Sequence, residues 1–283
     1  MEINSVLRRF LVCALAALSV AGALPASAPA QEKPAAKEEK PKKQEEPKPA
    51  KPDRNNPTGE QVAETVILIY GSREGLKQIR RTGVERGKIT RTAADGRPEE
   101  IAYERTFKRG DTFDKDKMRL DQRLSSLEYS LVFNDGRVTG ILRGTPFTPK
   151  QEDVSWIMTE RVHGIEALLR YKETGAAVKF NGKDTQKGLD LWVLELTDKE
   201  GRSTRFYISS KSARVLWLEY DEAGAKYKRT FHNYRVVQGT LVPYRTVLYE
   251  GDRLVEESQV MTVTYGVKTE DSVFAAQSAS AAP

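Results

Sequence analysis

The chain has 283 residues and a single cysteine, and its formal net charge at pH 7 is +6. This length fits one domain with a sizeable core plus additional segments. Basic residues are interleaved with acidic ones, as in residues 85–88 and 252–257, and form no basic stripe, which excludes a nucleic-acid-binding profile. The cysteine, Cys13, lies in a segment that we expect to be removed, so the mature protein has neither disulfides nor thiolate chemistry.

The first thirty residues have the pattern of a cleavable signal peptide. Arg8 and Arg9 precede an apolar run over residues 10–24, and Ala-Pro-Ala at residues 28–30 fits a cleavage site. The apolar run is shorter than the roughly 20 residues that a membrane span needs. The sequence therefore predicts a signal peptide over residues 1–30, export of the protein and a periplasmic location.

A segment rich in Lys, Glu, Pro and Ala follows over residues 31–57. It contains no apolar run that could be buried in a core, so we predict a disordered leader. The leader is either a plain solvated segment or a spacer that tethers the domain at a distance from a membrane. The remaining residues, 58–283, are predicted to form one domain.

A helix is predicted at the start of the domain. Thr58 and Gln61 form a capping-box pattern, and apolar residues at helical spacing follow until Gly71. A second, short helical turn is expected at residues 74–77. Asn-Asp-Gly at residues 134–136 marks a tight hairpin. Strand patterns cover residues 79–92, 99–108, 117–124, 129–134 and 138–143.

A longer amphipathic helix is predicted from Gln151 to Tyr171. Thr148 and Pro149 have the pattern of an N-cap and a first helical residue. The apolar face of this helix needs a partner, so we expect it to cover the sheet as a lid. The residues assigned to the lid face are Val154, Ile157, Met158, Val162, Ile165 and Leu169.

The last third of the chain, residues 189–274, has the pattern of an antiparallel meander. Alternating apolar and polar runs are closed by short turn signals, and no connection is long enough for a crossover helix. The pattern predicts an α+β, mainly β fold, in which a highly curved antiparallel sheet of about 11 strands forms an unclosed half-barrel capped by two helices. Strand alternation assigns these residues to a concave face that is either a ligand cavity or a packed core: Trp192, Leu194, Leu196, Phe206, Ile208, Leu216, Leu218, Met261 and Val263.

The sequence contains no motif that indicates catalysis, such as a nucleophile elbow, a phosphate loop or a dinucleotide fingerprint. His163 and Glu166 supply only two of the three or four ligands of a zinc site, so we interpret them as a solvated helix face. His232 is expected to face solvent. Residues 114–116 begin like a calcium loop but lack its later glycine and glutamate, which indicates a charged turn. We therefore predict no enzyme activity, no metal and no cofactor.

The layout of residues 58–274 resembles the periplasmic outer-membrane lipoprotein-sorting proteins of the LolA/LolB-type superfamily. The resemblance rests on the opening helix that runs into Tyr70-Gly71, on segments 188–196, 205–209 and 231–243, and on the terminal strand that closes on Asp271 and Phe274. It implies an unclosed β-barrel covered by helices, with an apolar cavity for the acyl chains of a lipid or lipoprotein. It also implies envelope proteins as partners, only transient membrane contact and no cofactor.

Two interpretations other than a carrier remain open from the residues alone. One is a periplasmic scaffold or interaction domain with a filled core and no lipid cargo. The other is an enzyme of unrecognised type, which needs ionisable groups clustered in a cleft. Bulky side chains that plug the concave face favour the scaffold over the carrier.

Overall fold

The structure, a computed structural model, describes residues 56–92 and 96–275, and all elements named below belong to one compact unit. The predicted signal peptide, residues 1–30, and all but the end of the predicted leader, residues 31–57, lie outside the described residues. Within the described ranges, no helix is both long enough and apolar enough to cross a membrane.

The first helix, α1 (Gly59–Tyr70), begins and ends as predicted. The Thr58 hydroxyl accepts a hydrogen bond from the Gln61 amide at 3.2 Å, and the Gln61 side chain accepts one from the Thr58 amide at 2.9 Å. Gly71 ends the helix at a φ of +134°, which strains any other residue. The next helix, α2 (Arg73–Ile79), includes Ile79, which the strand pattern had wrongly assigned to the first strand.

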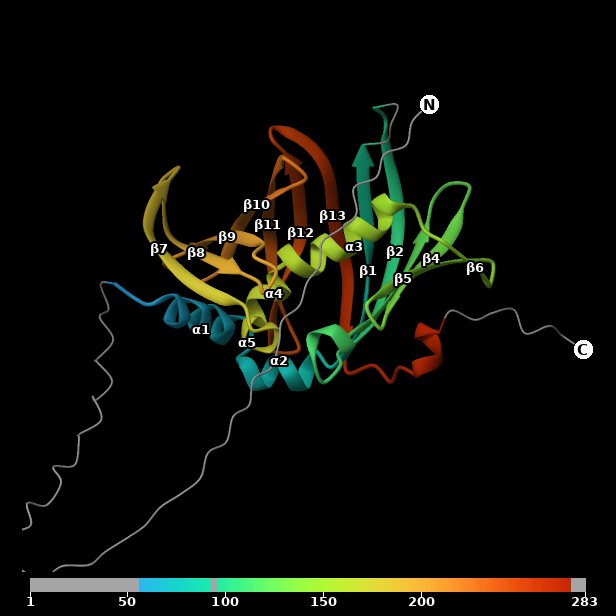
Figure 1. Cartoon of the computed structure of the whole chain (residues 1–283), viewed down its shortest axis with the longest axis horizontal. Helices are drawn as coiled ribbons and strands as arrows, with labels where there is room; N and C mark the ends of the chain where they lie inside the picture. The colour runs from blue at the N-terminus through green and yellow to red at the C-terminus, as the bar shows by residue number, and fades with distance from the viewer. Residues whose placement is uncertain (1–55, 93–95, 276–283) are drawn as a thin grey trace, which may run out of the picture. The chain divides into compact units, whose positions relative to one another are not determined.

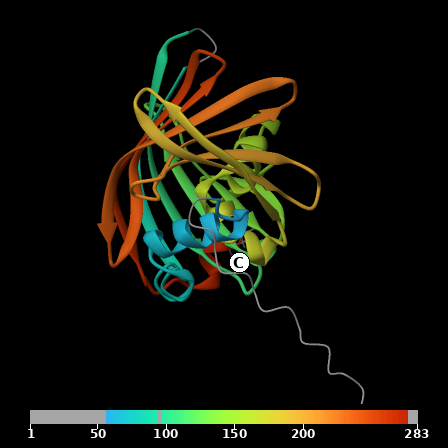
Figure 2. The ribbon, with the colours of Figure 1, turned by 90° about the vertical axis from the view of Figure 1, so that its left-hand side faces the viewer.

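Thirteen antiparallel strands of the described residues form one sheet, in the spatial order β6-β5-β4-β3-β2-β1-β13-β12-β11-β10-β9-β8-β7. The sheet curls around the helices and its edge strands, β6 and β7, do not pair, so it remains unclosed (Figures 1 and 2). The strands are β1 (Thr82–Thr92), β2 (Pro98–Lys108), β3 (Lys117–Arg123), β4 (Glu128–Asn134), β5 (Arg137–Leu142), β6 (Thr145–Phe147), β7 (Ala177–Gln186), β8 (Leu189–Thr197), β9 (Ser203–Ser209), β10 (Val215–Glu222), β11 (Ala225–Val237), β12 (Thr240–Glu250) and β13 (Arg253–Tyr265).

The predicted fold class is confirmed: the domain is mainly β, with one curved, unclosed antiparallel sheet and a few short helices. The hairpin predicted at residues 134–136 is also confirmed, because Asp135 and Gly136 have φ values of +48° and +75°, as a type I′ turn requires. The sheet has thirteen strands instead of about 11. The three-residue strand β6 is one that the alternation pattern does not reveal.

The predicted helix from Gln151 to Tyr171 is three shorter helices, α3 (Gln151–His163), α4 (Ile165–Leu169) and α5 (Tyr171–Thr174). The break falls at Gly164, which is extended with a ψ of 170°. A Cβ atom there would lie 2.4 Å from the Glu160 carbonyl oxygen, so this bend tolerates only glycine. The N-cap of α3 is Lys150 and makes no side-chain capping bond, so the cap assigned to Thr148 is wrong.

The two largest hydrophobic clusters of the described residues lie along the sheet. The larger one, here called the α1 core, joins α1, α4 and the strands β8–β12 and includes the fully buried Val66, Leu168 and Leu218. The N-terminus of α1 rests directly on β7, because a Cβ at Gly59 would lie 2.5 Å from the Val178 carbonyl oxygen. The smaller one, here called the α3 cluster, joins α3 to strands β1–β4 and includes Ile157. Figure 1 shows α3 crossing in front of the sheet.

Candidate ligand cavity

The concave face of β8–β10 is filled by the α1 core. Five of the nine residues assigned to the cavity lining are at most 3% exposed there, and Trp192 is partly buried against them. Their packing partners are side chains of α1 and α4, which occupy the space over these strands. The five buried residues are Leu194, Leu196, Phe206, Ile208 and Leu218.

The other three assigned residues lie elsewhere. Leu216 packs with Tyr207 and Trp217 in a separate cluster, because a register shift at residues 215–217 breaks the alternation of β10. Met261 is 62% exposed, next to another register shift between β1 and β13. Val263 is buried beside Val242 and Tyr265. Assigning faces by strict alternation along each strand therefore gives the wrong face at Leu216 and Met261. None of the nine assigned residues lines the cavity described in the next paragraph.

A cavity of about 260 Å³ lies between α3, α4 and the strands β1–β3 and β11–β13. Two of the residues assigned to the lid face, Ile157 and Ile165, line it. Leu169 instead packs in the α1 core, and Met158 is 36% exposed. Val154 and Val162 are half-buried away from the cavity. The apolar part of the wall includes Ile89, Tyr103, Phe107, Met118, Leu120, Trp156, Phe231, Leu241 and Val260.

The hollow lies where two neighbouring strands, β12 and β13, carry short side chains. Ser258 of β13 pairs in register with Ile89 of β1 on one side and with Thr246 of β12 on the other. All three residues line the cavity, and two of them carry only a hydroxyl-bearing side chain. On β1, position 87 has room only for glycine, since a Cβ there would lie 2.3 Å from the Gln259 carbonyl oxygen and 2.8 Å from the Tyr103 side chain. This part of the sheet therefore leaves space that α3 does not fill.

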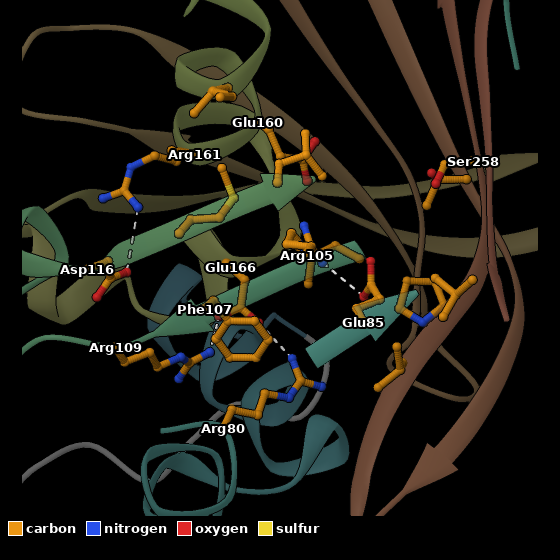
Figure 3. Close-up of a pocket in the computed structure, with 18 of the residues that line it drawn as sticks. Arg80, Glu85, Arg105, Phe107, Arg109, Asp116, Glu160, Arg161, Glu166 and Ser258 are labelled. Atoms are coloured by element: carbon orange, nitrogen blue, oxygen red, sulfur yellow. Dashed lines mark hydrogen bonds and ion pairs between the residues drawn. The ribbon is translucent and has the colours of Figure 1, made fainter. Parts of the chain in front are cut away.

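The other side of the wall is charged, with eight basic and five acidic side chains, so basic groups exceed acidic ones by three. Figure 3 shows part of this side of the wall, with Glu85, Asp116 and Glu166 each joined to an arginine by dashed lines. The basic residues are Arg80, Arg105, Lys108, Arg109, Lys117, Arg161, Arg170 and Arg229, and the acidic residues are Glu85, Asp116, Glu160, Glu166 and Glu256.

Glu166 joins two of these arginines. Its carboxylate accepts hydrogen bonds from Arg80 Nη1, at 2.6 Å, and from Arg109 Nη2. Burial alone raises the pKa of Glu166, but the charges of Arg109, Arg80 and Arg170 outweigh it and lower the pKa to about 2. Glu166 is thus a partly accessible side chain that bridges two arginines, a role that the interpretation as a plain solvated helix face did not include. The sequence contains one sign of this ion pair, namely an acidic residue inside the otherwise apolar stretch 165–169.

Asp116 holds a second group of arginines. It forms a two-pronged ion pair with Arg170 and lies 3.7 Å from Arg161 Nη1. The Gly110 amide also donates to Asp116, at 3.0 Å. The Arg161 guanidinium stacks over the Phe113 ring, at 4.3 Å from its centre. Residues 113–115 form a short 3-10 turn, as the charged-turn interpretation predicts, but Asp116 itself is buried.

Glu85 pairs with Arg105 at 2.9 Å and accepts a hydrogen bond from the Tyr103 hydroxyl at 2.8 Å. Burial lowers the pKa of Arg105, but the charge of Glu85 outweighs this effect and raises it. The Nε atoms of Arg80 and Arg105 and the indole nitrogen of Trp156 are buried without a hydrogen-bond partner among the described residues. Each such donor costs about 1–3 kcal/mol. The cavity wall therefore holds unused donors as well as excess positive charge.

His163 is a packing residue at the end of α3. Its ring stacks on Tyr220 at 4.1 Å between centres, and its Nδ1 lies 2.6 Å from the Thr204 hydroxyl. Burial lowers the pKa of His163 to about 4. The described residues contain no group of three or more His, Cys, Asp or Glu side chains that could hold a metal ion. His232 is exposed, as predicted.

The buried His163 predicts a loss of stability in mild acid. Because its pKa falls from 6.5 to about 4 on folding, the neutral form stabilises the fold fully above pH 6.5, and this stabilisation is lost as the pH falls toward 4. We expect the free energy of unfolding to drop by about 2 kcal/mol between pH 7.5 and pH 5.0. Denaturant titrations of the wild type and of His163→Phe at both pH values measure the drop. An equal drop in His163→Phe would assign it to other groups.

Comparisons with known proteins bear on the fold alone. No protein-family model matches the sequence, and no curated protein matches it. The structure is similar to that of a DUF1329 family protein from Desulfovibrio piger, with a TM-score of 0.56 and 10% identity over 76% of this chain and 96% of that protein. It is also similar to a LolA superfamily protein from Nitrosomonas europaea, with a TM-score of 0.55 and 11% identity over 78% of this chain and 98% of that protein. The chain therefore has a divergent LolA-like fold.

Proposed function

From the LolA-like fold and the cavity under α3, we propose that this protein is a non-catalytic periplasmic carrier. The cavity holds acyl chains of a lipid or lipoprotein while they move toward the outer membrane, and contact with a membrane is transient. The observation that carries the proposal is a cavity of about 260 Å³ with an apolar wall on the concave side of an unclosed sheet. Hiding apolar surface from water is worth about 25 cal/mol per Å², so transport needs no chemistry and no cofactor.

We also propose that α3 is the lid. The cavity lies near the lower end of the usual range of ligand pockets, about 300–1,000 Å³, so a long chain requires α3 to shift. In α3 only Ile157 and His163 are buried, so little apolar surface resists its movement. Polar contacts hold it in place: Thr159 donates to Glu222 at 2.8 Å, and Glu160 pairs with Arg229 on β11. Gly164 supplies a bend at the end of the helix.

A second candidate function is a scaffold or interaction domain without lipid cargo. The packed α1 core favours it, because the face assigned to ligand binding along β8–β10 is plugged by bulky side chains. The two candidates differ in one measurable property, the presence of a ligand. Native mass spectrometry and lipid extraction of the purified full-length chain should reveal co-purifying phospholipid or acylated peptide if it is a carrier. A ligand-free protein that also takes up no fluorescent fatty acid would identify a scaffold.

Filling the cavity should abolish uptake. A Ser258→Trp substitution places a large ring where a hydroxymethyl group lines the hollow between β1 and β12, so we expect at least a tenfold loss of affinity for a fluorescent C16 fatty acid. The matched control is Gln259→Trp, on the same strand but exposed and outside the cavity lining. Fluorescence titration measures both variants. Unchanged uptake by a folded Ser258→Trp variant would place the ligand elsewhere.

A further inference from the structure

We propose that the cargo is an anionic amphiphile, whose carboxylate or phosphate binds between Arg80 and Arg109 and replaces Glu166 there. This inference rests on the proposed carrier function and names the chemical class of its ligand. The apolar wall accounts for an acyl chain, and the arginine pair accounts for the charged end of the same molecule.

The first argument is the geometry around Glu166. Oε1 lies 2.6 Å from Arg80 Nη1, and Oε2 accepts from Arg109 Nη2, so one carboxylate bridges two guanidinium groups (Figure 3). Guanidinium groups recognise carboxylates and phosphates through such paired hydrogen bonds. The side chain of Glu166 thus marks the position and orientation that an external anion of the same chemistry takes.

The second argument is that Arg80 is held rigidly for such a contact. Its side chain is 8% accessible, its Nη2 donates to the Leu241 carbonyl at 2.8 Å, and its guanidinium lies 5.5 Å from the centre of the Tyr265 ring. Its Nε is nevertheless buried without a partner. A ligand carboxylate in place of Glu166 binds an Arg80 guanidinium that is already held in position. A ligand phosphate has a further oxygen that can accept a hydrogen bond from the unpaired Nε of Arg80.

The third argument is charge. The cavity lining contains three more basic than acidic side chains, and Glu166 alone neutralises only one of the two arginines that it bridges. A cleft with excess positive charge attracts anions and disfavours cationic ligands. Burial lowers the pKa of Arg109, and the neighbouring Arg170 and Arg80 lower it further, so these cations repel one another. An additional anion relieves this repulsion.

The fourth argument is that Glu166 can leave. Its side chain is 41% accessible, whereas the side chains of Arg80 and Arg109 are 8% and 13% accessible. It lies in the first turn of α4, two residues after the Gly164 bend that ends the proposed lid. Because α4 packs in the α1 core, Glu166 leaves by rotation of its own side chain when α3 shifts away from it. The carboxylate then returns to water while both arginines stay in the wall.

The test compares two ligands with the same chain and different ends. Fluorescence titration of the full-length protein is done with a labelled C16 fatty acid and with its uncharged methyl ester. We expect the acid to bind at least tenfold more tightly than the ester. Arg109→Gln should remove most of this preference, and circular dichroism checks that the variant is folded. Arg81→Gln, an exposed neighbour of Arg80, is the charge control and should bind the acid like the wild type.

Glu166→Gln should bind the acid several-fold more tightly, because the competing carboxylate is gone. Equal binding of acid and ester by the wild type would overturn this inference and leave the carrier function intact. Binding of neither ligand would overturn both. If inorganic phosphate binds as tightly as the fatty acid, the arginines serve a free anion and the assignment to an amphiphile is wrong.

Discussion

A Leu194→Glu variant is expected not to fold. Leu194 of β8 is fully buried in the α1 core, where it packs with the side chains of α1 and α4. Removing a buried leucine side chain costs about 2–5 kcal/mol, and an unpaired carboxylate in its place adds a desolvation penalty of similar or larger size. The sum is comparable with the whole stability of a typical domain, about 5–15 kcal/mol. Circular dichroism should show no cooperative thermal transition for this variant.

The matched control is Leu189→Glu, on the same strand but 47% exposed. A substitution at such a site changes stability by about 0.5 kcal/mol or less. A cooperative melt of Leu194→Glu near that of the control would show that the α1 core is loose or hydrated. It would reopen β8–β10 as a ligand-binding face, which the packing described above excludes.

Asp116→Ala should destabilise the domain by about 3–5 kcal/mol, because it removes the carboxylate from a buried ion pair. Arg170 is 4% exposed and, among the ion pairs of the described residues, would keep only Glu173 as a charged partner. Arg161, on the proposed lid, would lose its only nearby carboxylate among the described ion pairs. Denaturant titration measures the change in the free energy of unfolding.

Two further variants separate this effect from a general cost of losing an acidic residue. Glu100→Ala removes an exposed strand carboxylate that pairs with Lys88 at 2.7 Å, and it should cost less than about 1 kcal/mol. Adding Arg170→Met to Asp116→Ala removes the unpaired buried cation and should recover part of the lost stability. A double variant that is even less stable than Asp116→Ala would show that the burial of Arg170 is not the cause.

The start of α1 and the hairpin at residues 134–136 were predictable because their signals are local. The capping box of Thr58 and Gln61 needs only residues three positions apart, and the turn at residues 134–136 needs only residues that adopt positive φ. Helix length was less predictable, since the apolar pattern continues across Gly164 although the backbone bends there. Curvature was predictable from short connections and alternation, but alternation fails wherever a bulge inserts a residue.

The candidate site was not predictable because it depends on residues far apart in the chain. Arg80 and Arg109 meet Glu166 across 86 and 57 positions, so no spacing in the sequence relates them. Apolar alternation is the same whether a helix plugs a strand or leaves it uncovered. The sequence of β8 therefore identified an inward face correctly, but only the position of α1 shows that this face is filled.

The α1 core fills the sheet over β8–β10, which line no part of the hollow, and among the strands the two regions meet only at β11 and β12; this partial separation affects how the protein can evolve. Mutations that reshape the wall around Ser258 act outside the packing of α1 against β8–β10. Substitutions at well-separated sites have nearly additive effects on stability. One half of the sheet can thus maintain the fold while the other half changes specificity, so descendants of such a domain can acquire new cargo without first gaining a reserve of stability.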